Sequence, residues 1–182
     1  MPTFGVNVVV LRDEEVLLTL RSDFPVWCLP GGAIEVGETF VEAAIREVWE
    51  EARAEVEIMG IVGVYSRPNW RDGGNHEVVF VGKQIGGELV PQDGEATEVA
   101  YFSSAELPNS LLWWHRERIF DALQAEQTVA RKQDAQWPFA GINYEEGKQL
   151  VSKGKLLKQH LVDQFCKKPS NADSHVEIGG NK

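Results

Sequence analysis

The chain has 182 residues, 43% of them hydrophobic and 25% charged, which is enough for one domain with its own core and an appendage. Its net charge of −10 argues against a nucleic-acid polymer as partner, because phosphate backbones are bound by clustered lysine and arginine. The sequence has no run of about eighteen apolar residues, so we expect no membrane span. An amino terminus without a basic segment argues against a signal peptide, and two distant cysteines, Cys28 and Cys166, suit free thiols in a cytoplasmic protein.

Short apolar runs bounded by turn residues predict a series of strands. These strands cover residues 5–11, 15–20, 27–29, 55–66, 76–85 and 99–103. Two helices are expected between them, at about residues 39–53 and 113–126. Strands and helices that interleave in this way indicate one mixed α/β domain, which we place at residues 1–126.

The first helix has a clear beginning, because Thr39 is followed three residues later by Glu42, the spacing of a capping box. Apolar residues then recur at helical spacing, and we expect this stripe to pack on the sheet. The stripe consists of Phe40, Val41, Ala44, Ile45 and Val48.

Beyond the domain, residues 127–168 form an expected C-terminal extension, with one helix at 145–167. Four apolar residues lie near one face of that helix, namely Leu150, Leu157, Leu161 and Phe165. Three outcomes are open for this stripe: burial on the chain's own domain, burial on a second subunit, or a loosely attached, solvated helix. A compact domain of this size needs no further helix, so we favour a second subunit, which gives a homodimer. The polar tail, residues 169–182, has too little apolar content to order itself.

Three glutamates on the first helix are spaced for metal binding. Glu47, Glu50 and Glu51 stand at i, i+3 and i+4, so their side chains converge on one face. Like charges at this spacing repel, and a divalent cation among them would remove that repulsion. Gly31 and Gly32, ahead of the helix, let the backbone approach such a cation. The alternative interpretation of the glutamates alone is a solvated acidic face.

The surrounding residues favour the metal site, because the stretch resembles the Nudix box, G-x5-E-x7-R-E-U-x-E-E-x-G-U, where U is aliphatic. The matching residues are Gly32, Glu38, Arg46, Glu47, Val48, Glu50 and Glu51. The resemblance covers about residues 5–123. It departs from the box at Arg53, where the family has a glycine suited to a helix C-cap, and Ala54 follows at the aliphatic position.

This resemblance implies a Nudix-type α/β/α sandwich with a mixed sheet, to which this chain adds a C-terminal helical extension. It implies Mg²⁺ or Mn²⁺ bound by Glu47, Glu50 and Glu51, with Glu38 as a supporting carboxylate and the Gly31 carbonyl as a further ligand. The family's reaction is the attack of water on a nucleoside diphosphate linked to another group. Such a small nucleotide suits an acidic protein if the cation screens its carboxylates.

The remaining catalytic roles fall on residues outside the three glutamates. Arg46 lies one turn from Glu50 and is expected to orient a catalytic carboxylate by a charge-assisted hydrogen bond. The general base is expected in the loop before the strand at 99–103, where Glu95 ranks ahead of Asp93 and Glu98. These three side chains are equally well explained as ordinary polar loop residues.

Arg21, Trp27 and Gly32 are the candidates for substrate binding: the arginine for a phosphate, the tryptophan for stacking on a base, the glycine beside the diphosphate. A strand-end cation and a core tryptophan are the alternatives for the first two. Pro68 lies fourteen residues after Ala54, near the position of a proline in ADP-ribose pyrophosphatases of the family. ADP-ribose or a nucleotide sugar is therefore the first expectation. The alternatives are clean-up of modified nucleoside triphosphates and a non-catalytic Nudix-fold nucleotide sensor.

Overall fold

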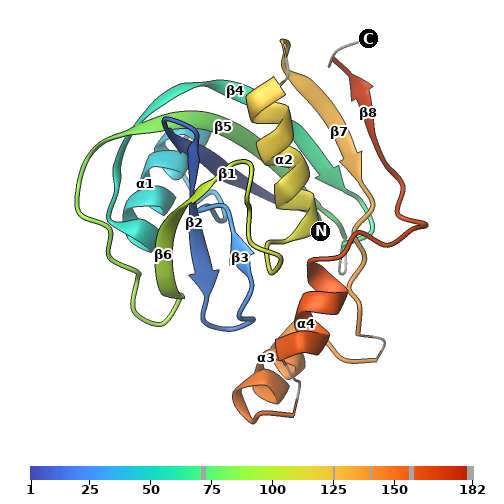
Figure 1. Cartoon of the computed structure of the whole chain (residues 1–182). Coiled ribbons are helices and arrows are strands. Elements are labelled where there is room, and N and C mark those ends of the chain that lie inside the picture. The colour runs from blue at the N-terminus through green and yellow to red at the C-terminus, as the bar shows by residue number, and fades with distance from the viewer. Residues whose placement is uncertain (71–72, 125, 140, 156–157, 180–182) are drawn as a thin grey trace.

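A mixed sheet forms the centre of the protein (Figure 1), as seen in a computed structural model that describes residues 1–70, 73–124, 126–139, 141–155 and 158–179. Within these residues the sheet has eight strands. Its order is β3 (Trp27–Cys28), β2 (Glu15–Arg21), β1 (Thr3–Arg12), β5 (Asn75–Gly86), β4 (Glu55–Arg67), β7 (Val129–Gln133) and β8 (Ser174–Ile178), and β6 (Ala96–Ser103) also pairs with β2. β1 runs parallel to β5, and β4 runs antiparallel to β5. The predicted strands are confirmed.

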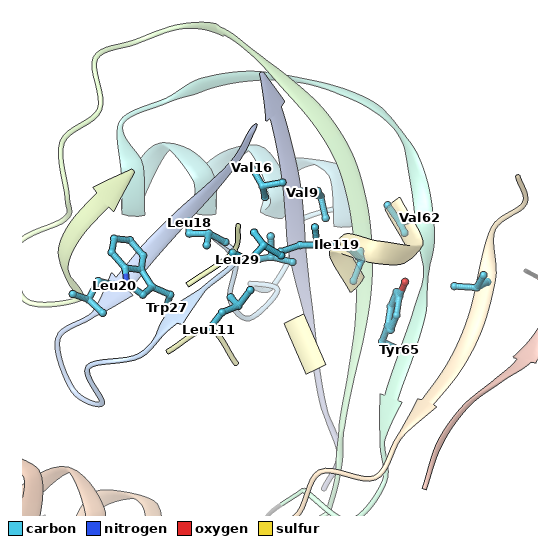
Figure 2. Packing of buried hydrophobic residues seen from close by; sticks show 13 residues of the cluster. Val9, Val16, Leu18, Leu20, Trp27, Leu29, Val62, Tyr65, Leu111 and Ile119 are labelled. Atoms are coloured by element: carbon cyan, nitrogen blue, oxygen red, sulfur yellow. The ribbon is translucent and has the colours of Figure 1, made fainter. Parts of the chain in front are cut away.

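Two helices, α1 (Phe40–Ala52) and α2 (Trp113–Gln124), cover opposite faces of the sheet. Alternate side chains of β1 show this directly. Val8 packs in the cluster with Val48 of α1, whereas its neighbour Val9 packs with Ile119 of α2 (Figure 2). Successive residues of a strand point to opposite faces, so the two clusters lie on either side of the sheet. The predicted α/β/α sandwich is confirmed.

The capping box of α1 is present: Thr39 Oγ1 accepts from the Glu42 backbone N–H at 3.2 Å, and Glu42 Oε2 accepts from the Thr39 N–H at 2.8 Å. The predicted packing stripe is only partly correct. Ala44 and Val48 are fully buried together with Ala43 and Ala52, but three predicted members, Phe40, Val41 and Ile45, are more than 40% exposed. Because small alanines bring the helix close to the sheet, the buried face is rotated toward the side that carries Glu47.

The C-terminal extension continues the sheet. β7 pairs in parallel with β4, and β8 pairs antiparallel with β7. The prediction that the tail cannot order itself is therefore wrong for residues 174–178. The open edge of β7 supplies backbone hydrogen bonds, and these do not depend on the apolar content of the added strand. No described helix has the length and apolar content needed to cross a membrane.

The single helix predicted at 145–167 is wrong, because two short helices, α3 (Tyr144–Ser152) and α4 (Lys158–Phe165), take its place at one end of the sheet (Figure 1). Gly154 follows α3 with a φ of 65°, a left-handed conformation that interrupts a helix. Leu157 lies outside the described residues. Leu161 and Phe165 are buried against the chain's own domain, next to Trp114, so the argument that a second subunit must cover them fails.

Candidate active site

The loop after β3 lies against the carboxylate of Glu47. Glu47 is only 8% exposed, and a Cβ atom on Gly32 would overlap its carboxylate oxygens. Gly31 has a φ of +150°, and a Cβ there would overlap the backbone of β1. Glycine at both positions therefore allows the loop to fit between β1 and the buried face of α1.

Arg46 joins this loop to the acidic face of α1. Its Nε and Nη2 donate to the two carboxylate oxygens of Glu38 at 2.7 and 2.9 Å, and Nη2 also donates to the Ala33 carbonyl at 3.0 Å. Its Nη1 donates to Glu47 Oε1 at 2.9 Å and to Glu50 Oε2 at 3.1 Å. The hydrogen bonds from Arg46 and from the Glu35 backbone lower the pKa of Glu38 to about 2, so Glu38 stays ionised.

Glu51 points away from that arginine, toward β2. Its Oε2 accepts a hydrogen bond from Thr19 at 3.2 Å. Burial raises the pKa of Glu51 to about 8, although Arg21 opposes the shift, and the charge of Glu47 adds to it. Burial likewise raises the pKa of Glu47. Two partly desolvated carboxylates side by side are electrostatically costly, and a cation between them would offset that cost.

The predicted metal ligands are near one another but are not yet a complete ligand set. Among the described histidine, cysteine, aspartate and glutamate side chains, no group of three is arranged to hold a metal. Arg46 occupies one oxygen each of Glu47 and Glu50, whereas Glu51 turns to Thr19. The donors still fit Mg²⁺ or Mn²⁺ chemically, because both ions prefer carboxylate oxygens. The Glu50 side chain is 41% exposed and has room to turn.

Glu95 lies in the turn directly before β6, and this turn brings it toward α1. Its charge is close enough to contribute to the raised pKa of Glu47. Gln92 lies between this turn and α1. When its side-chain amide is turned so that the nitrogen faces the neighbouring acceptors, that nitrogen donates to Glu95 Oε2 at 3.2 Å and to the Glu50 backbone carbonyl at 3.3 Å. Glu95 therefore lies at the edge of the acidic face, whereas its role as general base stays a prediction.

A cavity of about 440 Å³ opens beside the glycine loop, and Gly31 and Gly32 form part of its lining. This volume lies within the range of small-molecule pockets. Arg21 also lines the cavity, but its guanidinium already donates to Asp23 at 2.9 and 2.7 Å and to the Tyr144 hydroxyl at 2.9 Å. A phosphate would therefore meet a guanidinium that is held in place.

The structure does not support the prediction that Trp27 contacts the substrate. It is 8% exposed, belongs to the core cluster that contains Ile119, and packs edge-on against Phe102 with ring centroids 4.7 Å apart. Trp27 is not among the residues that line the cavity, whereas Trp70 is.

Several cavity residues have no signal in the local sequence pattern. His115 lines the cavity, and its Nδ1 accepts from the Leu29 backbone N–H at 2.9 Å. This bond places the proton of the neutral ring on Nε2. Burial, assisted by the charges of Arg118 and Arg67, holds the pKa of His115 well below its usual value, so the ring stays neutral.

A buried ionic network supports the cavity from the side of α2. Glu77 contacts Arg67 at 3.0 Å and Arg118 at 2.6 Å. Arg118 is fully buried, donates to Gln133 Oε1 at 3.1 Å, and donates to the side-chain oxygen of Asn7. The network joins β1, β5, α2 and β7, which meet only in the folded chain.

In this three-layer sandwich the acidic helix lies against a glycine loop, and the cavity opens beside that loop. Such an arrangement is that of a class of hydrolases that act on phosphorus-containing acid anhydrides. The family model described as "NUDIX domain" matches residues 1–123 of the chain. The chain therefore belongs to the Nudix family of hydrolases. Members of this family generally use a divalent metal.

Two similar proteins carry different substrate names. An ADP-ribose pyrophosphatase of Methanocaldococcus jannaschii is 36% identical over 128 residues, which cover 68% of this chain and 74% of that protein. A Bacillus subtilis protein named "Putative 8-oxo-dGTP diphosphatase" is 33% identical over 130 residues, covering 71% and 85%. A NUDIX hydrolase structure from Nitrosomonas europaea superimposes with a TM-score of 0.59 at 30% identity, covering 65% of this chain and 68% of the other.

Proposed function

We propose that the protein hydrolyses the diphosphate of a nucleoside diphosphate linked to another group, with ADP-ribose or a nucleotide sugar as the first candidate. The observation that carries this proposal is the position of the cavity. It shares Gly31 and Gly32 with the loop that lies on Glu47, so a diphosphate at the loop would have its nucleoside in the cavity. The similarity to the ADP-ribose pyrophosphatase of Methanocaldococcus jannaschii supports this substrate class.

In this proposal Glu47, Glu50 and Glu51 hold Mg²⁺ or Mn²⁺, and the Gly31 carbonyl is a further ligand. The carbonyls of Pro30 and Gly32 accept hydrogen bonds from β1 at 3.0 and 2.9 Å. Two carbonyls of the loop are therefore already engaged with β1, and Gly31 lies between them. When bound, the cation would neutralise charge on the diphosphate and make the attacking water more acidic.

The chain's own residues position the reactants. Arg46 fixes the carboxylates of Glu38, Glu47 and Glu50 relative to one another. Glu95, beside the acidic face, would accept a proton from the water that attacks one phosphorus. The bond from that phosphorus to the bridging oxygen breaks, and the other phosphate leaves with the bridging oxygen. Little covalent chemistry falls to the protein, so positioning accounts for most of the rate.

A second candidate function is the hydrolysis of modified nucleoside triphosphates, which the similarity to the Bacillus subtilis protein favours. The same acidic helix would serve both reactions, and only the group bound in the cavity would differ. A non-catalytic nucleotide sensor has less support, because it has no need for Glu47, Glu50 and Glu51 together.

A substrate panel with two variants tests the proposal. ADP-ribose, nucleotide sugars and 8-oxo-dGTP are incubated with Mg²⁺ or Mn²⁺, and the products are identified by mass. We expect Glu50→Gln and Glu51→Gln each to lower kcat by at least ~10²-fold, because a metal ligand contributes several kcal/mol to charge stabilisation. Glu42→Gln is the matched control on α1, since glutamine keeps the capping box. Normal turnover in both site variants would overturn the proposal.

A further inference from the structure

The C-terminal extension forms part of the cavity wall. Trp137, Tyr144 and Phe165 all line the cavity, and all lie beyond residue 123, where the match to the family description ends. They face aromatic side chains of the Nudix domain. Trp137 lies 6.0 Å from Trp70 between ring centroids, and Phe165 lies 5.6 Å from Phe24. Part of the cavity lining is therefore aromatic and comes from both parts of the chain.

Specific contacts hold this wall in place. The Tyr144 hydroxyl donates to Asp23 Oδ2 at 2.6 Å and accepts from Arg21 at 2.9 Å, which ties α3 to the end of β2. A Cβ on Gly147 would lie 3.2 Å from Trp137 and 3.3 Å from Phe24, so glycine allows α3 to lie close to both rings. The wall is thus a packed element of the fold.

The cavity lining combines two kinds of residue. Gly31 and Gly32 belong to the loop that lies on Glu47 of the acidic helix, whereas Trp70, Trp137 and Phe165 are aromatic. Arg21 connects them: its charge acts on the Glu51 carboxylate, and its guanidinium donates to Tyr144 of the extension. A ligand with a phosphorylated end and a flat apolar end matches this division, because aromatic side chains stack on nucleobases.

We propose that the C-terminal extension is the base-binding wall of the substrate site, with Trp137 as the residue that determines affinity for the base. This inference rests on the proposed function, because it assigns the base-bearing half of the same substrate. It also gives the extension a task separate from the hydrolytic chemistry, which stays on α1 and the glycine loop.

Binding measurements on the full chain test this assignment without any turnover. Calorimetry compares AMP, GMP and UMP with ribose 5-phosphate, which carries the same sugar and phosphate without a base. We expect the protein to bind at least one nucleotide more tightly than ribose 5-phosphate. Trp137→Leu should lower the affinity for that nucleotide by at least about fivefold, the usual loss when a stacking side chain is removed. Its effect on ribose 5-phosphate should be less than twofold, about the scatter of the measurement.

Phe139→Leu is the matched control. Phe139 belongs to the same buried cluster and contacts Trp137 at 5.3 Å between centroids, but it does not line the cavity. It should lower the melting temperature while leaving nucleotide affinity unchanged. If Trp137→Leu does not fold, Trp137→Met replaces it, because methionine fills apolar space without an aromatic face, and it should also weaken only the nucleotides.

Two outcomes would overturn the inference: equal affinity of the protein for all four ligands, or equal weakening of the nucleotide by the Trp137 and Phe139 variants. Either result would leave the hydrolytic panel untouched. Conversely, a protein that binds nucleotides through Trp137 but hydrolyses nothing in the panel would overturn the proposed function alone.

Discussion

The Arg46 guanidinium donates to both carboxylate oxygens of Glu38, from Nε at 2.7 Å and from Nη2 at 2.9 Å. Lysine offers a single charged point and cannot reproduce this fork. We therefore expect Arg46→Lys to lower activity or metal affinity about 10- to 100-fold, as is usual when a partner of metal ligands is removed. Steady-state kinetics over a range of Mg²⁺ concentrations measure the effect.

Arg12→Lys is the control for that substitution. Arg12 also contacts a carboxylate with two nitrogens, at 3.2 and 2.8 Å from Glu15 Oε2, but the pair is exposed at the turn between β1 and β2. Its replacement should leave the kinetics unchanged. If Arg46→Lys behaves like Arg12→Lys, the arginine has no part in arranging the acidic face.

Arg53 ends α1 in the left-handed conformation, with φ 55° and ψ 21°, and its N–H donates to the Trp49 carbonyl. Glycine adopts this conformation without steric cost, so Arg53→Gly should stabilise the protein by up to ~1 kcal/mol. The gain is reduced by the loss of the guanidinium, which lies 5.4 Å from the Trp49 ring centroid. Arg53→Ala loses the same contact and keeps the strain. A lower melting temperature for Arg53→Gly than for Arg53→Ala would contradict this reasoning.

Glu77 should make stability depend on pH. Burial alone would raise its pKa, but Arg118 and Arg67 outweigh burial and hold it below the usual value. The contribution of Glu77 is then present above the unfolded-state pKa of about 4.3 and is lost as the pH falls toward its folded value. Glu77→Gln should cost about 3–5 kcal/mol at pH 7, since it leaves buried guanidinium groups uncompensated.

Urea unfolding at neutral and acidic pH tests this expectation, because the difference between Glu77→Gln and the parent should shrink below about pH 4. The control is Glu57→Gln: Glu57 pairs with Lys83 at 2.7 Å, but both side chains are more than half exposed. Exposed pairs contribute at most about 1 kcal/mol. A difference for Glu77→Gln that stays constant with pH would refute the assigned ionisation.

A chain that ends at Glu126 is not expected to fold stably, although the sequence predicts a domain boundary there. The truncation would remove Gln133, a hydrogen-bond partner of the fully buried Arg118, together with the buried Leu161 and Phe165. Circular dichroism and thermal melting should show loss of cooperative unfolding. A chain that ends at Lys168 loses β8 and the segment before it, including Asp173, which pairs with Lys132, and should still unfold cooperatively at a lower temperature. Cooperative melting of the shorter chain near the parent temperature would restore the predicted boundary.

Local patterns were sufficient to predict much of this fold. The capping box at Thr39, the helix that follows and the main strands depend on neighbours within a few residues, and the structure contains them. Each of these features is encoded within one or two turns of chain, so periodicity and spacing predict it.

Several of the wrong or missing predictions concern contacts between distant segments. Trp27 and Trp70 both lie near strand ends, and both are buried in core clusters. Only tertiary packing decides that Trp70 also lines the cavity. Tyr144 meets Arg21 across 123 residues. β8 forms because β7 offers it a free edge for backbone pairing. The composition of residues 174–178 therefore does not predict this strand.

The pairing of β7 with β4 also sets the order in which a growing chain can become functional. Gly63 of β4 lies beside Val129 of β7, and a Cβ on this glycine would overlap the Val129 carbonyl. α1 and Gly63 are synthesised well before Val129, since synthesis runs from the amino terminus. The acidic helix is therefore made early, whereas the cavity lining is complete only after synthesis reaches Phe165. An unfinished chain would carry the carboxylates but would lack the aromatic wall that we propose binds the base.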